Sequence, residues 1–341
     1  MAVTLNDIAE RVGVSVSTVS RVLNKKATSH RISTDTESLV LQAARDLDYK
    51  ANHLARGLRL SQTNTIGVVA PDVSNPFFAR VVKRIQTRAH ALGYSLIVCD
   101  SDESLDLEVE QVNLLYRKRV DGLIAMPVGQ HFEHFEEWAG REVPLVLVDR
   151  GTDALEVDSV IVDNYRGAFE ATEHFLDHGH HQIAVVQGLG GTSTNTDRLA
   201  GYHDALAARG VSADDRLLVG GDFGEATGYA ATGHLLDLDR PPTAIFATGD
   251  LITLGALQAI DERGLSIPDD VSLISFDDFD FAPFLRCPLT AVEQPKGPMG
   301  EAAVDLFADQ IVRPGRAPRR VTLRPRLVVR ESVRPPDGET G

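Results

Sequence analysis

The sequence predicts a mixed α/β protein in two parts, a small helical module at the N-terminus and a larger body of parallel sheets covered by helices. Apolar residues recur at helical spacing through residues 5–47. From about residue 65 onward, short apolar runs that are typical of buried strands alternate with helical segments. A length of 341 residues is enough for two or three domains with cores of their own.

The two parts differ in charge. The chain carries a net charge of −15, yet residues 1–60 hold nine Lys and Arg against six Asp and Glu. The remaining 281 residues hold 25 basic and 43 acidic side chains. This asymmetry indicates an anionic partner for the N-terminal module, although an excess of +3 is weak evidence without local motifs.

Composition excludes several classes of protein. With 43% hydrophobic and 24% charged residues, the chain is neither disordered nor of low complexity. No apolar run approaches the roughly 18 residues of a membrane helix, and the N-terminus has no signal-peptide pattern. The only cysteines, Cys99 and Cys287, form no disulfide framework. We therefore expect a cytoplasmic protein with no membrane partner.

Residues 4–23 have a helix-turn-helix pattern. Thr4 and Asp7 are spaced as a capping box, Gly13 can end the first helix, and Ser15 can begin the second. A third helix is expected at 34–47, after Ser33. In such a module the N-terminal part of the second helix enters the DNA major groove. The alternative is an ordinary helical hairpin with solvated polar residues.

The second helix carries side chains suited to reading bases. Val16, Ser17, Thr18 and Arg21 fall in its N-terminal part, and Arg21 can reach guanine O6 and N7 with two donors. Residues 51–60 are short and basic and would be marginal as an isolated helix. Within them, Leu58 could act as an apolar wedge in the minor groove, although a plain linker explains the composition equally well.

The body repeats one rhythm of strand and helix twice. The expected strands are 65–70, 95–99, 122–126, 145–148, 183–186, 244–247 and 271–275. The expected helices are 77–92, 105–119, 164–178, 196–209 and 251–263. Ligands of parallel sheets bind at the carboxyl ends of the strands, which is where polar and aromatic residues gather in this sequence. A ligand site is expected there.

A search for catalytic and metal motifs is negative. Dinucleotide-binding, P-loop, nucleophile-elbow and zinc-protease patterns do not occur in the sequence. The histidines of residues 178–181 are interpreted as solvated residues at a helix end. The carboxylates of residues 277–280 could hold a cation, but bonding to ligand hydroxyls explains their position as well. We therefore expect no metal, no cofactor and no enzymatic activity; a hydrolase on the same fold is the alternative.

Several motifs, in this order, resemble the LacI/GalR family of bacterial transcription regulators from Thr4 to about Arg330. They are Val14-Ser15 followed by Thr18-Val19-Ser20-Arg21-Val22-Leu23-Asn24, then Leu54-Ala55-Arg56-Gly57-Leu58, Ile66-Gly67-Val68-Val69, Pro71-Asp72-Val73-Ser74-Asn75-Pro76-Phe77-Phe78, Asp149-Arg150, Arg198-Leu199-Ala200-Gly201-Tyr202, Asp270 through Asp278, and Gln294-Pro295. One departure is Gly249, which stands where the family pattern usually has Asn before Asp250.

The resemblance implies a homodimeric repressor that binds a roughly palindromic operator. It implies a DNA-binding domain at 1–50, a hinge helix at 51–60 and an effector-binding and dimerisation domain at 61–341. That domain would be doubly wound and similar to the type I periplasmic sugar-binding proteins, with lobes at about 64–162 plus 292–323 and about 163–291 plus 324–332. Crossings between lobes are expected near 162–164, 291–293 and 323–326. Residues 333–341 are expected to be disordered, and no leucine heptads predict a tetramer.

The resemblance also implies the site residues. The DNA-binding set is Val16, Ser17, Thr18, Arg21, Asn24, Leu58 and Arg59. The effector-binding set is Asn75, Phe77, Phe78, Asp149, Arg150, Arg198, Phe223, Asp250, Asp277 and Gln294.

These effector-site residue types suit a sugar that controls a carbohydrate-utilisation operon, because phenyl rings cover C–H faces while charged and amide groups bond hydroxyls. The alternatives are structural ion pairs, Asp149–Arg150 or Arg198–Asp277, and a purine or other non-sugar effector. The sign of the response stays open, since lobe closure can favour either state.

Overall fold

The computed structural model of the chain describes residues 3–23, 30, 32–49, 63–141 and 143–336. Contacts divide the chain into two units, Met1–Thr63 and Asn64–Gly341. The fold class predicted from the sequence is confirmed: a three-helix N-terminal unit is followed by an α/β body with two sheets. Within the described ranges, no helix has both the length and the hydrophobicity needed to cross a bilayer.

The N-terminal unit contains α1 (Leu5–Val12), α2 (Val16–Leu23) and α3 (Thr34–Asp46). The predicted capping box is present, because the Thr4 hydroxyl accepts from the Asp7 amide and the Asp7 carboxylate accepts from the Thr4 amide. Gly13 ends α1 in the left-handed conformation, at a φ of 72°. Ser15 Oγ accepts from the Thr18 amide at 3.2 Å at the start of α2. The three helices share a core of Ile8, Ala9, Val19, Val22, Val40, Ala43 and Ala44.

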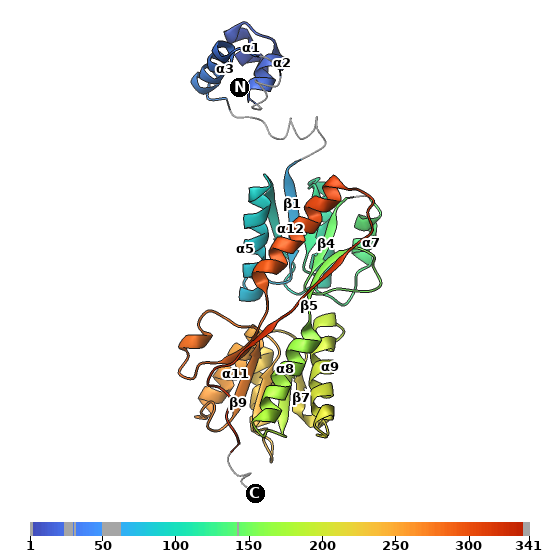
Figure 1. The fold of residues 1–341 in the computed structure, drawn as a ribbon, viewed down its shortest axis with the longest axis vertical. Coiled ribbons are helices and arrows are strands. Elements are labelled where there is room, and N and C mark those ends of the chain that lie inside the picture. Colours follow the sequence, from blue (N-terminus) through green and yellow to red (C-terminus); the bar gives the residue numbers. More distant parts are fainter. Residues whose placement is uncertain (1–2, 24–29, 31, 50–62, 142, 337–341) are drawn as a thin grey trace. The chain divides into compact units, whose positions relative to one another are not determined.

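The first lobe of the body is built on a six-stranded parallel sheet with the order β11-β5-β4-β3-β1-β2. Its strands are β1 (Thr65–Ala70), β2 (Ser95–Asp100), β3 (Gly122–Ala125), β4 (Leu145–Val148), β5 (Asp158–Val162) and β11 (Arg320–Leu323). Its helices are α5 (Pro76–Ala91), α6 (Leu105–Arg117), α7 (Glu133–Ala139) and α12 (Lys296–Val312). Helices α5 and α12 cover one face of the sheet, and α6 and α7 pack on the other (Figure 1).

The second lobe repeats this plan with the order β12-β10-β9-β8-β6-β7. Its strands are β6 (Ile183–Gln187), β7 (Leu218–Gly220), β8 (Ala244–Ala247), β9 (Ser272–Phe276), β10 (Thr290–Glu293) and the antiparallel edge strand β12 (Arg326–Val328). Its helices are α8 (Asn164–Asp177), α9 (Ser193–Ala208), α10 (Glu225–Leu236) and α11 (Asp250–Glu262), with short 3₁₀ turns η2 (Asp215–Leu217) and η3 (Ala282–Phe284). Helices α8 and α9 share one core, and α10 and α11 share another.

The chain passes between the lobes three times: after β5, between β10 and α12, and between β11 and β12. The second passage differs from the expected crossing at 291–293. Those residues belong to β10, which pairs with β9 and β12 in the second lobe, so the chain crosses only after Glu293. Because three separate segments connect the lobes, each lobe is assembled from distant parts of the sequence.

The expected disorder of the C-terminal tail is wrong for residues 333–336. Val333 is buried, and the Arg334 amide donates to Ser272 Oγ at 3.2 Å. Just before it, the Ser332 hydroxyl donates to the Leu273 carbonyl at 2.6 Å. These bonds hold the tail against the first residues of β9, an interior strand of the second sheet. The composition of the tail does not reveal these contacts. Residues 337–341 lie outside the described residues.

Candidate DNA-binding surface and effector cleft

The outer side of α2 carries the residues predicted to read DNA. Val16, Ser17 and Arg21 are exposed, and Thr18 is half-buried. Ser15 Oγ lies 2.8 Å from both Ser17 Oγ and Thr18 Oγ1, so three hydroxyls gather at the N-terminus of α2. The positive end of the helix dipole favours a phosphate at such a position. Three predicted contacts lie outside the described residues: Asn24, Leu58 and Arg59.

In the body, two aspartates occupy equivalent places in the two sheets. Asp149 follows β4 and Asp277 follows β9, and each of these strands is third in the order of its six-stranded sheet. Both backbones have positive φ, 71° at Asp149 and 101° at Asp277. Such conformations are uncommon outside glycine and cluster at functional sites. Both side chains are buried.

These aspartates help to line a small cavity of about 30 Å³ between the lobes. The lining residues are Phe77, Phe78, Asp149, Arg150, Thr194, Arg198, Phe223, Asp277 and Gln294. Eight of them are in the predicted effector set, and the ninth, Thr194, is in the first turn of α9 and was missed. Thr194 follows the loop after β6, at the carboxyl end of that strand, and this position could have predicted it as a ligand contact.

The two remaining predicted residues lie beside the cavity and join the lobes. Asn75 Nδ2 donates to Asp250 Oδ1 at 3.1 Å, between the N-termini of α5 and α11. Asn75 also caps α5, because its Oδ1 accepts from the Phe77 amide at 2.8 Å. Burial and the nearby Asp277 charge raise the pKa of Asp250 to about 6. The hydrogen bond between Asn75 and Asp250 therefore connects the two lobes.

Arg150 is held by the first lobe and faces the second. Its terminal nitrogens donate to both Glu103 oxygens, at 2.6 and 2.7 Å, and Nη1 also donates to the Val128 carbonyl at 2.7 Å. Burial lowers the pKa of Arg150, but the hydrogen bonds and charge of Glu103 outweigh burial, and the net shift is upward. The guanidinium lies 4.9 Å from the centroid of the Phe223 ring across the cleft.

Arg198 is buried in the second lobe. Its Nε donates to Asn164 Oδ1 at 2.9 Å, its Nη1 donates to the Thr248 carbonyl at 2.7 Å, and the guanidinium lies 3.7 Å from the Phe276 ring centroid. The hypothesis of an Arg198–Asp277 structural pair is thus replaced by these contacts, while Gln294 Nε2 donates to both Asp277 oxygens at 3.1 and 3.2 Å.

Three buried polar atoms around the cavity have no hydrogen-bond partner: Asp149 Oδ1, Arg150 Nε and Gln294 Oε1. The Arg150 Nε lies 4.0 Å from the other Asp149 oxygen, which is too long for a hydrogen bond. Burial raises the pKa of Asp149 to about 6, although Arg150 and Arg198 oppose this shift. Unpartnered buried groups are destabilising by about 1–3 kcal/mol each, so a cluster of them in one cavity indicates groups reserved for a ligand.

A glycine explains how Phe223 reaches the cavity. A Cβ at Gly188 would lie 2.0 Å from the Phe223 ring, so any larger residue there would displace it. Gly249, where the family pattern usually has Asn, is also beside this ring. A Cβ at Gly249 would lie 3.5 Å from the Phe223 ring. Gly188 follows β6 at its carboxyl end, where the ligand-facing edge of the sheet lies.

The interpretation of the histidine run as solvated is wrong for His180. This side chain is buried; its Nε2 lies 2.8 Å from the Arg334 carbonyl and its Nδ1 lies 2.8 Å from Thr243 Oγ1. Because a carbonyl only accepts, Nε2 carries the proton. Burial lowers the pKa of His180 to about 4, so the ring is neutral. Within the described ranges, no group of three or more His, Cys, Asp or Glu side chains could hold a metal ion.

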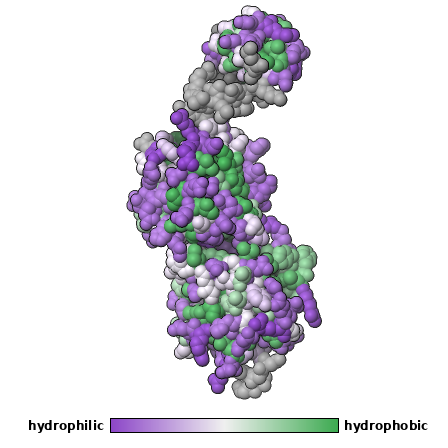
Figure 2. Space-filling model, turned by 180° about the vertical axis from the view of Figure 1, so that it is seen from behind, coloured by the Kyte–Doolittle hydropathy of each residue, from purple (hydrophilic) through white to green (hydrophobic). Residues whose placement is uncertain are grey.

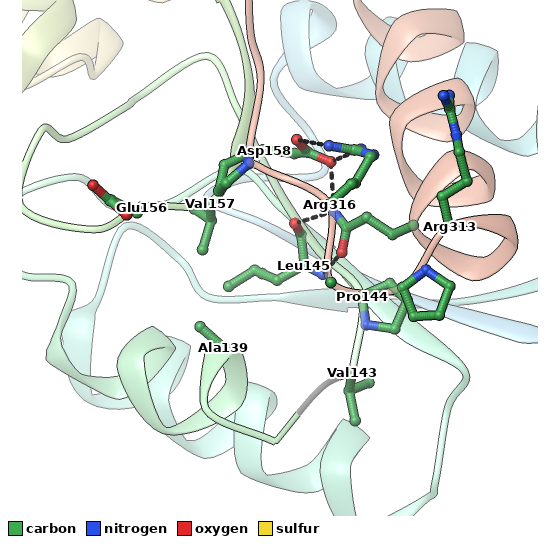
Figure 3. Close-up of a pocket in the computed structure, with 13 residues that line it drawn as sticks. Ala139, Val143, Pro144, Leu145, Glu156, Val157, Asp158, Arg313 and Arg316 are labelled. Atoms are coloured by element: carbon green, nitrogen blue, oxygen red, sulfur yellow. Dashed lines mark hydrogen bonds and ion pairs between the residues drawn. The ribbon is translucent and has the colours of Figure 1, made fainter.

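A larger cavity of about 380 Å³ lies in the first lobe at the amino ends of β4 and β5, at the opposite edge of the sheet from the interlobe cavity. Figure 3 shows its polar side, where Arg316 lies against the buried Asp158 carboxylate. Gln310 Nε2 donates to the same carboxylate at 2.6 Å. The Arg319 amide completes this set at 2.7 Å. Because every Asp158 oxygen is already bonded within the protein, we interpret this cluster as structural.

A three-helix module with an exposed recognition helix, joined to a two-lobed body with a cavity between its lobes, defines the class of ligand-responsive DNA-binding regulators. Comparison with known proteins agrees. Residues 4–52 match the family model of bacterial regulatory proteins, lacI family, and residues 172–333 match a periplasmic binding protein-like domain. The chain belongs to the LacI family of transcription regulators.

The similarity extends over nearly the whole chain. The transcriptional regulator DegA of Bacillus subtilis is 36% identical over 338 residues, which cover 98% of this chain and 99% of DegA. The structure of the Lac repressor dimer bound to operator and the anti-inducer ONPF superposes with a TM-score of 0.86 at 30% identity, covering 97% of this chain and 99% of that one. The complex of the regulator CelR with cellobiose has a TM-score of 0.73 at 30% identity, covering 97% and 100%.

Proposed function

We infer that this regulator is a repressor of carbohydrate-utilisation genes and that a small neutral sugar, bound in the interlobe cavity, controls its affinity for operator DNA. The observation that carries this proposal is the composition of one cavity: three phenyl rings surround buried donors and acceptors that lack partners. Rings of this kind pack on the C–H faces of a sugar, and the polar atoms pair with its hydroxyls. The cellobiose complex of the related CelR supports the same effector class.

Binding would act through the angle between the lobes. A cavity of about 30 Å³ is far smaller than the ~300–1,000 Å³ of ordinary ligand sites, so entry of a sugar requires the lobes to separate. Several contacts besides Asn75–Asp250 hold the lobes together. Gln130 Nε2 donates to the Gly190 carbonyl at 2.8 Å, and the Gly151 amide donates to Ser193 Oγ at 3.1 Å. Arg80 of α5 also forms an ion pair with Asp280 of the second lobe. A ligand that bridges both lobes at one angle selects that angle.

A purine is the second candidate effector. The edge-to-face pair of Phe77 and Phe78, with ring centroids 5.1 Å apart, and the Phe223 ring opposite could also hold a planar base.

A thermal-shift screen separates the two classes. We expect a neutral monosaccharide or disaccharide, among ribose, glucose, galactose and cellobiose, to raise the melting temperature, since a ligand that binds only the folded state stabilises it. The matched control is Asp277→Ala, which should remove that response. A rise with adenine, guanine or hypoxanthine, and none with any sugar, would contradict the sugar assignment. Anisotropy with operator fragments selected by the purified protein then gives the sign of regulation.

The protein acts as a cytoplasmic homodimer on a roughly palindromic operator, with Val16, Ser17 and Arg21 of each copy near the bases. Edge strand β2 supports this proposal, because it exposes Ile97 and Val98, at 37% and 43% of their surface. Figure 2 shows hydrophobic patches of this kind within a mainly hydrophilic surface. Apolar edge strands are normally covered by a partner. Sedimentation equilibrium should give twice the chain mass, and Val98→Lys should lower it; a monomeric wild type would refute the assignment.

A further inference from the structure

The turn after β2 has a strained backbone, and this strain fixes the position of the Glu103 side chain. Asp102 and Glu103 both adopt positive φ, 48° and 50°, although neither is glycine. Two bonds fix them, from the Asp102 amide to Asp100 Oδ1 and from the Glu103 amide to the Pro71 carbonyl, each 2.8 Å long. Strain of this kind persists only where surrounding contacts over-determine the conformation, and it is often part of a functional site.

The strained turn directs the Glu103 carboxylate onto Arg150. Both Glu103 oxygens accept from the two terminal nitrogens of Arg150, which is the strong bidentate geometry. The Arg150 side chain is 3% exposed and lines the cavity, whereas Glu103 is 33% exposed and does not line it. Glu103 does not line the cavity, yet it binds the two terminal nitrogens of Arg150. An anionic ligand would need these same two nitrogens. The Phe223 ring lies over the guanidinium, so Nε, which lacks a hydrogen-bond partner, is the Arg150 donor that remains for a ligand.

A second ion pair neutralises another charged residue of the cavity, Asp277. Lys296 Nζ lies 3.2 Å from Asp277 Oδ1 and donates to the Asp278 carbonyl at 2.9 Å. Of the charged residues that line the cavity, Arg150 is neutralised by Glu103 and Asp277 by Lys296. Arg198 and Asp149 remain and oppose each other in sign. The cavity thus presents no uncompensated cation to a bound molecule, despite its two arginines.

We propose that Glu103 is a specificity-determining residue that restricts the effector to uncharged molecules, by holding the Arg150 fork so that a phosphate or carboxylate group cannot bind it. This proposal rests on the proposed function, because it concerns the same cavity. It predicts that removing the Glu103 charge, and nothing else, converts the cavity to one that accepts anions.

The test measures melting temperatures in inorganic phosphate and in D-ribose 5-phosphate, at an ionic strength kept constant with sodium chloride. Wild type should show no stabilisation by either anion. Glu103→Gln should be stabilised by both, with an affinity gain of about tenfold or more, which is the usual size of a charge-assisted hydrogen bond. The double variant Glu103→Gln/Arg150→Met should lose that gain. Glu137→Gln, which removes an acidic partner of Arg141 in the same lobe but outside the cavity, should behave as wild type.

Each outcome bears on the proposal. Equal stabilisation of wild type and Glu103→Gln by the anions would overturn it, as would a folded Glu103→Gln that ignores them. A purely structural role would lower the melting temperature of Glu103→Gln equally in chloride and in phosphate. If Glu103→Gln does not fold, as judged by circular dichroism, Glu103→Ala replaces it, and wild type must still exclude ribose 5-phosphate. Failure of every neutral sugar with wild type would refute the sugar effector, while the phosphate arm still tests Glu103.

Discussion

Replacing Asp149 with Asn is expected to stabilise the fold at neutral pH and to abolish the effector response. Asn preserves the shape of the side chain and tolerates the left-handed backbone at a φ of 71°. It removes a carboxylate whose pKa is raised from 3.8 to about 6, chiefly by burial. The folded state therefore favours the protonated acid, and ionising it costs free energy that the unfolded chain does not lose.

The magnitude follows from that shift. A rise of about 2 pKa units corresponds to about 3 kcal/mol. Because the folded pKa is the higher one, the stabilisation is complete below pH 3.8, decreases as the pH rises toward 6, and is absent at pH 7. The difference in unfolding free energy between Asp149→Asn and wild type should therefore be near zero at about pH 4 and grow to about 3 kcal/mol at about pH 7.

Urea unfolding across this pH range measures the difference directly. Asp237→Asn is the matched control with the opposite sign, because the hydrogen bond from the exposed Arg263 lowers the pKa of Asp237 and its loss should destabilise the protein at neutral pH. A variant Asp149→Asn that is less stable than wild type at neutral pH, or a difference that does not change with pH, would refute the reasoning.

Three further predictions concern other residues. Arg21→Ala should weaken operator binding by about 1–3 kcal/mol and relax specificity at one base pair, with little change on random DNA; anisotropy that falls equally on both would assign Arg21 to phosphate instead. Arg198→Ala should bind operator normally but fail to respond to the effector, and a normal response in titrations would exclude Arg198 from the cavity. His180 has a pKa lowered to about 4, so wild type should lose stability as pH falls from about 6.5 toward 4, and His180→Asn should flatten that part of the urea profile; equal slopes would contradict it.

The sequence predicted the regular core of the body well and its edges poorly. Buried parallel strands such as β1 and β8 are apolar runs, which the alternation with helices makes visible. Helix α12 was missed because Gly297, Pro298 and Gly300 lie in its first turns and weaken the helical pattern. Edge strands β11 and β12 were also missed, since arginines interrupt their short apolar patterns. The order of residues 333–336 depends on contacts with the distant β9.

For the candidate site, motifs located most of the cavity lining but none of its supporting contacts. Phe77, Asp149 and Asp277 follow strands directly, so the rule for parallel sheets was enough to group them. The role of Glu103 depends on a bidentate bond to a residue 47 positions away, which no local pattern encodes. Asn75 and Asp250 were predicted to contact the effector, whereas the structure shows them bonded to each other.

The three crossings between lobes have a consequence for folding during synthesis. The first lobe receives α12 and β11 only from the last part of the chain, where Phe307 and Met299 complete its core and Arg316 bonds Asp158 from 158 residues away. A nascent chain that ends before residue 296 therefore exposes the apolar face of β1 and α5 that α12 later covers. Since closing such a long loop is slow relative to local contacts, this unfinished lobe is the stage at which the growing chain most needs protection from aggregation.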